Sequence, residues 1–302
     1  MSNVIAIGQA ALALNYKGGN VTPYVGGRIA NMAASLGVAG LDVDYVSECG
    51  NDAIGDVIVD FFKKNNVETK SIDRFIDGQS QMTLHFFNEN GEEKVSDYVN
   101  YPKTRFNVLW PTINKNDIVV FGSFFALDES VHQQLIELLT FARERKAIIV
   151  YLPGFNPRLC SRITRVMPAI LENLELSDIV IAREMDMENI FNVKTAQEAY
   201  DKHISFYCKN FVFVNRNFDV SMHLNNQCIS YTNNSQEHPI GWNAAFCAGL
   251  IYGISSQNIT LDDLKEGTNL DKASKFALDF ANKGLSNHSN VVSKEFINSL
   301  KF

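Results

Sequence analysis

Short runs of consecutive apolar residues alternate along the chain with stretches in which apolar residues return every three or four positions. The runs predict strands at 4–8, 43–46, 118–122, 147–152, 178–182 and 211–214. The longer stretches predict helices at 28–36, 57–65, 129–146, 163–174 and 196–209. Continuous apolar strands separated by helices are typical of a mostly parallel sheet that is buried on both faces. We therefore predict an α/β fold with a doubly wound sheet, whose ligands bind beyond the C-terminal ends of the strands.

Residues 80–87 and 94–101 show a different pattern, in which apolar and polar positions alternate on either side of Asn90-Gly91. An Asn-Gly pair between two such runs is a strong signal for a β-hairpin. The apolar side chains of the first run have no obvious core of their own; they are Met82, Leu84, Phe86 and Phe87. One interpretation is an ordinary hairpin at the edge of the main sheet.

Composition narrows the class of protein. The 302 residues are 46% hydrophobic and 20% charged, with a net charge of -7 and no basic run, so nucleic acid is not an expected partner. No apolar stretch is long enough to span a bilayer, and residues 1–9 do not resemble a signal peptide. The five cysteines are scattered and form no C-x-x-C pair, which favours a reducing, cytoplasmic location.

The stretch 238–253 carries the clearest chemical signal. Pro239 and Gly241 precede an Ala-rich run with Phe246, Leu250 and Ile251 at helical spacing. A loop that opens a helix presents unpaired backbone N–H groups to anions. We therefore expect an anion hole at Gly241, Trp242 and Asn243, although the large Trp242 side chain either fills that pocket or points outward.

This stretch resembles the C-terminal signature of the ribokinase-like (PfkB) carbohydrate kinases, Asp-Thr-x-Gly-Ala-Gly-Asp-x-Phe-x-x-Gly. Two earlier motifs also resemble the family, in the ranges 26–37 and 50–55. The matching residues are Gly26, Gly27, Asn31, Ala33, Leu36, Gly37, Gly50, Asp52, Gly55, Gly241, Phe246, Gly249, Tyr252 and Gly253. The resemblance covers nearly the whole chain. It implies one ribokinase-like domain over 1–302, with a small β lid from about 12–24 and 78–101.

The resemblance also implies a sugar site. In the family the paired glycines, here Gly26 and Gly27, lie under the sugar, and the Asn at position 31 reaches a sugar hydroxyl. The alternative for Asn31 is a hydrogen bond within its own helix. The family Asp that binds sugar hydroxyls is replaced by Ala13, which removes a charge-assisted hydrogen bond of about 1.5–3 kcal/mol. The lid covers the sugar and in many members forms a dimer face.

The positions that the family uses for phosphoryl transfer all differ. Ala244 occupies the place of the catalytic base, and His238 is either a substitute base or an ordinary loop residue. At the metal motif, Asp186 either helps to hold Mg²⁺ through water or forms a salt-bridged helix start with Arg183. The nucleotide loop, with Asn215 and Asn217, contains no glycine.

Two functions follow from these differences. In one, a carbohydrate-kinase-like protein binds a sugar-like or nucleotide-like small molecule but has lost phosphoryl transfer. In the other, an active ATP-dependent sugar or nucleoside kinase uses a relocated base. The family's cofactors, ATP and Mg²⁺, are implied in either case, as is a possible homodimer through the lid.

Overall fold

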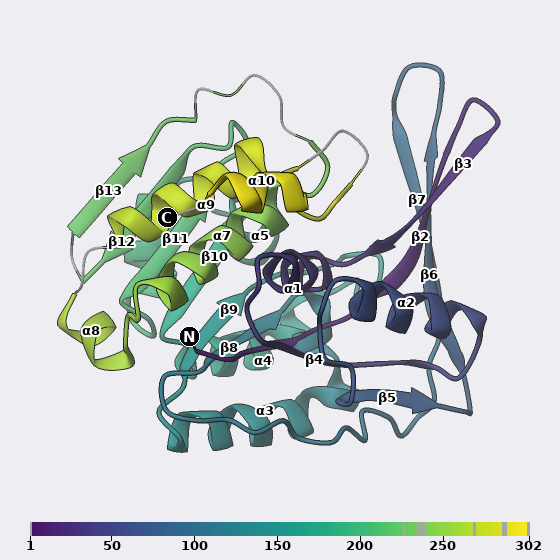
Figure 1. The fold of residues 1–302 in the computed structure, drawn as a ribbon, viewed down its shortest axis with the longest axis horizontal. Helices are drawn as coiled ribbons and strands as arrows, with labels where there is room; N and C mark the ends of the chain where they lie inside the picture. The colour runs from purple at the N-terminus through teal and green to yellow at the C-terminus, as the bar shows by residue number, and fades with distance from the viewer. Residues whose placement is uncertain are drawn as a thin grey trace.

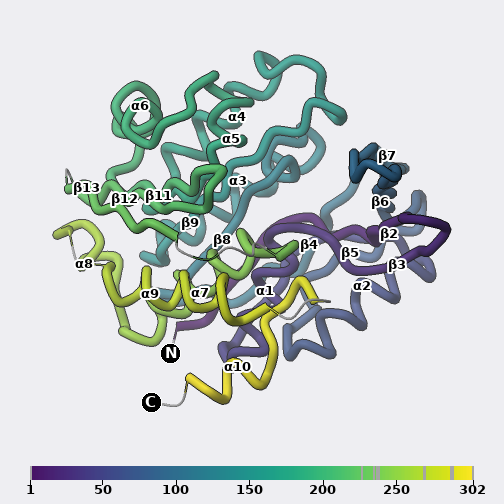
Figure 2. The backbone as a smooth tube through the Cα atoms, turned by 90° about the horizontal axis from the view of Figure 1, so that it is seen from above, coloured from purple at the N-terminus to yellow at the C-terminus, as the bar shows by residue number. Residues whose placement is uncertain are grey.

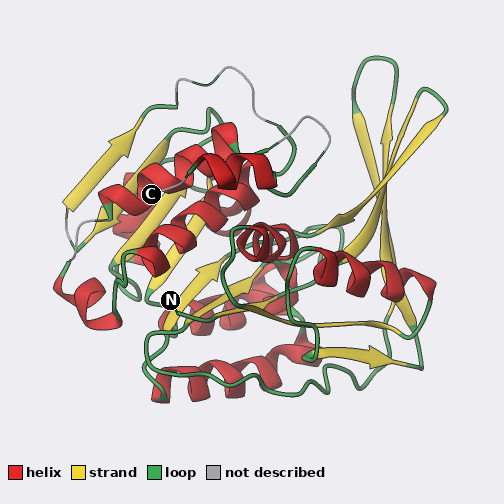
Figure 3. Cartoon of the chain, in the orientation of Figure 1, coloured by secondary structure: helices red, strands yellow, loops and turns green. Residues whose placement is uncertain are grey.

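The structure is a computed structural model, and it describes residues 2–225, 227–233, 235, 239–267, 270–285 and 289–300. His238 lies outside the described residues. Figure 3 shows helices packed around a large sheet, with long strands extending to one side. None of the helices in the described ranges is long and apolar enough to cross a membrane.

The main sheet has nine strands in the order β13-β12-β11-β10-β9-β8-β1-β4-β5. Neighbours pair in parallel except at β11–β12 and β12–β13, which are antiparallel. The strands are β1 Val4–Ile7, β4 Val43–Gly50, β5 Ile72–Phe75, β8 Ile118–Gly122, β9 Ile148–Leu152, β10 Ile179–Arg183, β11 Asn210–Val214, β12 Val220–Leu224 and β13 Gln227–Tyr231. This architecture confirms the predicted fold class.

Helices cover both faces of the main sheet because its strands are apolar on both sides. In β8, Ile118 and Val120 join one core cluster, and Val119 and Phe121 join the other. Figure 2 shows the two helical layers. One layer contains α1 Arg28–Val38, α2 Ala53–Lys64, α7 Trp242–Ser256, α8 Leu261–Glu266, α9 Asp271–Lys283 and α10 Lys294–Ser299. The other contains α3 Glu129–Glu144, α4 Ile163–Glu175, α5 Glu184–Phe191 and α6 Ala196–Ala199.

A second sheet of four strands, in the order β3-β2-β6-β7, projects from the body of the molecule (Figure 1). Its strands are β2 Ala11–Lys17, β3 Asn20–Gly26, β6 Gln79–Phe87 and β7 Glu93–Asn100. The predicted hairpin is therefore part of a separate sheet and not an edge of the main one. We call this second sheet the lid.

Two predicted helices differ from the observed ones. The helix predicted at 57–65 begins at Ala53, because the Asp52 side chain caps it by accepting a hydrogen bond from the Gly55 amide at 2.8 Å. The helix predicted at 196–209 is α6 followed by a wider π-turn at Tyr200–Ile204. Tyr200 stacks there on His223, with 4.4 Å between the ring centroids.

The topology of the main sheet places the ligand site. From β1 the chain builds β4 and β5 on one side, and β8 to β13 on the other. The strand order therefore reverses between β1 and β8, and such switch points are where open α/β sheets bind ligands. Gln9 follows the C-terminal end of β1 and Ser123 follows that of β8.

Candidate functional site

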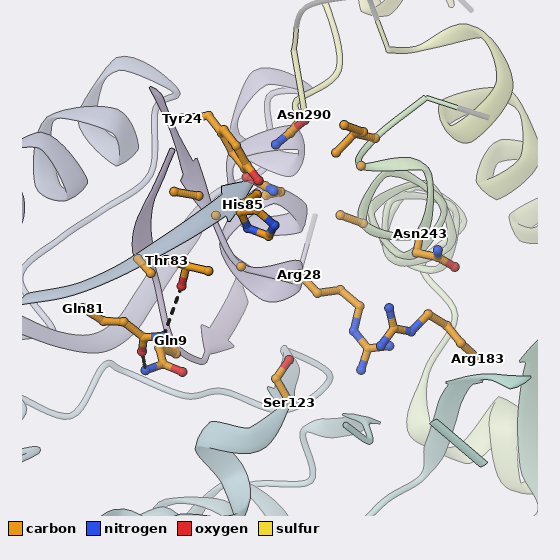
Figure 4. Close-up of a pocket in the computed structure, with 18 residues that line it drawn as sticks. Gln9, Tyr24, Arg28, Gln81, Thr83, His85, Ser123, Arg183, Asn243 and Asn290 are labelled. Atoms are coloured by element: carbon orange, nitrogen blue, oxygen red, sulfur yellow. Dashed lines mark hydrogen bonds between the residues drawn. The ribbon is translucent and has the colours of Figure 1, made fainter. Parts of the chain in front are cut away.

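A cleft of about 460 Å³ opens at this switch point, between the main sheet, the lid and the start of α7 (Figure 4). The strand ends of the main sheet and the loops beyond them contribute Gln9, Ser123 and Arg183. The lid contributes residues from three of its strands, and α7 contributes its first turn. These further lining residues include Ala13, Tyr24, Gln81, Thr83, His85, Asn243 and Ala244.

Residues from distant parts of the sequence that were expected to bind a ligand meet in this cleft. Ala13, Gly26, Gly27 and Asn31 line it from one side. Gly241, Asn243 and Ala244 line it from α7. Four other candidates are not among its lining residues: Asp186, Asn215, Asn217 and Trp242.

The paired glycines let the backbone between β3 and α1 pass close to the segment from Gln9 to Ala13. Gly27 caps α1 with φ 126°, a backbone conformation that residues other than glycine rarely adopt. A Cβ atom at Gly27 would lie 2.5 Å from the carbonyl oxygen of Gln9. The glycine at this position is thus required by the fold itself.

Asn31 is 94% buried, since only 6% of its surface is exposed, and it lines the cleft from the first turn of α1. Its amide N–H donates to the carbonyl of Gly27 at 2.9 Å, as a helical residue does. Within the described ranges, its side-chain oxygen Oδ1 has no hydrogen-bond partner. A buried polar atom without a partner is costly, which indicates that a ligand or water completes this site.

The polar residues of β6 form a side of the cleft that the sequence analysis missed. Gln81, Thr83 and His85 alternate with the apolar residues singled out earlier, and all three line the cleft. His85 Nδ1 lies 2.6 Å from Glu93 Oε1, and Thr83 donates to Asp97 at 2.9 Å. The period-2 alternation itself was the available signal, because alternate residues of a strand face the same side.

Trp242 is buried in the core and neither lines the cleft nor points outward. Its indole stacks on Phe246 with 5.4 Å between centroids, and Phe218 meets it edge-on at 4.9 Å. The indole N–H donates to Asn282 Oδ1 at 2.8 Å, and the backbone N–H donates to Pro239 at 3.1 Å. The expected anion hole therefore has a different composition from the one predicted.

The first turn of α7 still lines the cleft through Asn243 and Ala244. Gly241 precedes the helix in a left-handed conformation, with φ 97°. Among the residues that the structure describes, the amide N–H groups of Asn243 and Ala244 have no hydrogen-bond acceptor. These two amides lie at the positive end of a long helix, where anions bind favourably.

Asp186 is held by two arginines. Its Oδ2 accepts from Arg28 Nη1 at 3.0 Å and from Arg183 Nε at 2.9 Å, and its Oδ1 accepts from Arg183 Nη2 at 2.6 Å. Burial favours the neutral carboxylic acid, but attraction to Arg183 and Arg28 outweighs it and lowers the pKa of Asp186. The carboxylate is therefore charged, and both of its oxygens are already occupied.

This pairing does not fit the role of a magnesium ligand. A Mg²⁺ site needs carboxylate oxygens that are free to face the ion or its water shell, whereas those of Asp186 face two guanidinium groups. The described part of the chain also contains no group of three or more His, Cys, Asp or Glu side chains that could hold a metal ion.

Asn215 and Asn217 belong to the turn between β11 and β12. Asn215 Oδ1 accepts from the amides of Asn217 and Asp219, both at 2.9 Å, and its Nδ2 donates to Asp219 at 3.1 Å. The Asn215 side chain therefore stabilises its own loop. Phe218, in the same turn, covers the indole of Trp242. Of the two residues expected to contact a nucleotide, Asn215 uses its side chain and Asn217 its backbone amide to hold this turn.

Comparison with known proteins agrees with the fold. A model of the pfkB family of carbohydrate kinases matches residues 2–215. A 5-dehydro-2-deoxygluconokinase of Geobacillus thermodenitrificans (strain NG80-2) is 24% identical over 299 residues, covering 89% of this chain and 80% of that protein.

Two solved structures show the same fold. A fructokinase double mutant from Vibrio cholerae O395, bound to fructose, ADP and potassium ion, has a TM-score of 0.82 at 17% identity, covering 99% of this chain and 98% of its own. An aminoimidazole riboside kinase from Salmonella enterica, complexed with aminoimidazole riboside and an ATP analog, has a TM-score of 0.80 at 15% identity, covering 99% of each chain.

Proposed function

The chain belongs to the pfkB family of carbohydrate kinases, and from that premise we propose that it binds a sugar-like or nucleotide-like small molecule without transferring phosphate to it at a kinase rate. The observation that carries this proposal is the absence of a carboxylate from the described lining of the cleft. Ala244 stands at the base position, and the described lining residues include no Asp or Glu.

A missing general base lowers the rate of phosphoryl transfer but leaves ligand binding intact. General-base catalysis typically contributes about 10²–10⁴-fold to a rate. Proximity and the two amides of α7 would still support a slow reaction. The protein is then a weak or inactive member of a kinase family, and its function is binding.

Three features support retained binding. The glycine pair lines the cleft with backbone instead of side chains, and the buried Oδ1 of Asn31 has no partner among the described residues. The lid adds a row of polar side chains opposite α7. Sugar hydroxyl groups both donate and accept hydrogen bonds, so they are suited to this mixture of amide, hydroxyl and imidazole groups.

The cofactor sites support the loss of catalysis. ATP and Mg²⁺ are the family's cofactors, but Asp186 is occupied by arginines and the Asn215 side chain is occupied by its own turn. We expect ATP to bind weakly and Mg²⁺ to add little to its affinity.

The experiment combines two measurements on the same protein. Calorimetric titration with a panel of sugars and nucleosides measures binding, and ADP formation with each of them measures transfer. We expect saturable binding by at least one compound, with ADP formation far below the 1–100 s⁻¹ that is typical of kinases. Turnover at ordinary kinase rates would overturn the proposal.

A second candidate, an active kinase with a relocated base, is favoured by one observation. His85 lines the cleft and its Nδ1 is held by Glu93 at 2.6 Å, an arrangement in which a carboxylate orients an imidazole. If His85 is the base, turnover by the wild type should fall about 10²–10⁴-fold in His85→Gln. An unchanged rate in that variant would exclude this candidate.

We also propose that two copies pair through the lid and that the protein is cytoplasmic. Tyr16 and Phe86 contact one another on the lid, with ring centroids 5.8 Å apart, and they are 43% and 37% exposed. The five cysteines are free thiols, which favours a reducing compartment. Sedimentation of wild type and Phe86→Ser tests the pairing: a monomeric wild type would contradict it.

A further inference from the structure

The cleft contains a charged cluster that neither candidate function uses. Arg28 and Arg183 both line it, and both guanidinium groups contact the same oxygen of Asp186. Figure 4 shows the two guanidinium groups next to one another beside Asn243. Two positive charges and one negative charge leave a local excess of one positive charge. The chain as a whole carries a net charge of -7, so this site is a positive region in a negatively charged protein.

The cluster is rigidly held. Besides Asp186, Arg28 donates from Nη2 to the carbonyl oxygens of Leu152 and Pro153, at 2.9 and 2.5 Å. The Arg28 side chain is 11% exposed and that of Arg183 is 32% exposed. Arg183 uses Nε and Nη2 to hold Asp186, and its Nη1 has no acceptor among the described residues. A guanidinium fixed in this way is preorganised to bind an oxyanion.

Two further groups face the same cleft. The amides of Asn243 and Ala244, at the start of α7, supply donors without acceptors in the described part of the chain. Independently, Asn31 Oδ1 is a buried acceptor without a partner, and its residue lines the cleft. One ligand that satisfies all of these groups has a hydroxyl group for Asn31 and an oxyanion for the arginines and amides.

We propose that the ligand of this cleft is a polyol that already carries an oxyanion, either a phosphate monoester or a carboxylate, held by Arg28, Arg183 and the first amides of α7. This inference rests on the proposed function, because it names the class of ligand for the same cleft. A compound that enters with its anionic group in place needs no base and no phosphoryl donor. The replacement of the base by Ala244 also removes a carboxylate that would repel such a ligand.

The test measures the affinity of four probes by calorimetry at constant ionic strength: fructose, fructose 6-phosphate, gluconate and inorganic phosphate. Wild type is compared with Arg183→Gln, which removes the more exposed charge, and with Arg183→Lys, which keeps the charge without the planar fork. Arg165→Gln is the matched control, because Arg165 is exposed on α4 and does not line the cleft. Melting temperature without ligand shows whether each variant is folded.

We expect at least one of the two organic anions to bind wild type about tenfold or more tightly than fructose does. Arg183→Gln should remove that advantage, a loss of about 10- to 100-fold in affinity for the anion. Arg183→Lys should retain part of the advantage and Arg165→Gln all of it. Whichever anion carries the advantage identifies the ligand as a phosphate monoester or a sugar acid.

The inference would be overturned by equal affinities for neutral and anionic probes, by an advantage that survives in folded Arg183→Gln, or by binding of inorganic phosphate alone. No binding of any anion would also contradict it. None of these results depends on ATP turnover. Failure of the proposed function would instead be seen as rapid ADP formation, so the two failures are distinguishable.

Discussion

The groups that line the cleft and the predicted site residues that lie outside its lining use their hydrogen bonds in different ways. On the lid and α1 side, Asn31 presents an unpaired acceptor, and Thr83 and His85 line the cleft. Outside the lining of the cleft, two of the predicted site residues bind groups of the protein itself. Asp186 is occupied by arginines, and the Asn215 side chain is occupied by its own turn.

This difference separates backbone framework from side-chain chemistry. The strand ends, the glycine pair and the start of α7 form the framework of the cleft. What differs is whether each side chain near it has its hydrogen bonds satisfied inside the protein. Within the described ranges, Asn31 Oδ1 and the amides of Asn243 and Ala244 line the cleft without a partner and can bind a ligand. The side chains of Asp186 and Asn215 have instead become part of the structure. Function is thus determined by the site and not by the fold.

The largest expected effect on stability comes from Trp242, a predicted site residue that is buried in the core. Trp242→Ala should lower the free energy of unfolding by about 3–5 kcal/mol, because it removes a large buried ring and its stacking partners lose contact. Urea denaturation measures this change. The matched control is Trp110→Ala, since Trp110 is 44% exposed, and it should cost about 1 kcal/mol or less. Equal effects of the two substitutions would show that Trp242 is not a core residue.

The next largest effect on stability is expected at Asp186, whose carboxylate pairs with two arginines. Asp186→Asn should cost about 3 kcal/mol of unfolding free energy, because two guanidinium groups lose a buried charged partner. Asp279→Asn, which disrupts an exposed ion pair with Lys283 on α9, is the control and should cost less than about 1 kcal/mol.

The stabilisation from Asp186 should also depend on pH in one direction. The folded protein lowers the pKa of this carboxyl below its unfolded value. The stabilisation is therefore fully present above about pH 4 and is lost as the pH falls through the folded pKa. The stability difference between wild type and Asp186→Asn should shrink on acidification in urea titrations. A difference that grows with acidity would contradict the assigned ion pairs.

A smaller effect is expected at Ala13, on the lid side. Ala13→Asp should increase the affinity for a neutral sugar by about tenfold or more, because a carboxylate can accept charge-assisted hydrogen bonds from hydroxyl groups. Ala13→Asn keeps the size without the charge and should give a smaller increase. Calorimetric titration with fructose distinguishes the two. If both variants bind the sugar no better than wild type, the lid wall is not the sugar side.

Much of the fold could be predicted from the sequence, because local periodicity determines where strands and helices lie. The helix boundaries that were wrong depend on side chains: Asp52 caps α2 early, and Tyr200 lies at a change from α-helix to π-turn. The antiparallel strands β12 and β13 were not predicted, because they mix apolar and polar residues and contain no long run of consecutive apolar residues.

The candidate site could be predicted only where a motif named its residues. Ala13, Gly26, Asn31 and Asn243, which the motifs singled out, line one cleft, and their roles in binding stay predictions. The ion pair between Arg28 and Asp186 joins residues 158 positions apart in the sequence. No local pattern predicts such a pair, because only the assembled sheet brings the starts of α1 and α5 together.

The most direct test of the central claim is the rate of ADP formation by Ala244→Asp in the presence of the sugar that binds best. The control is Asn243→Asp, which places the same carboxylate one residue earlier in the first turn of α7. We predict a wild-type rate far below those of active kinases, an increase of about 100-fold or more in Ala244→Asp, and little change in Asn243→Asp. A wild type that turns over at 1–100 s⁻¹, with no gain in Ala244→Asp, would contradict the account.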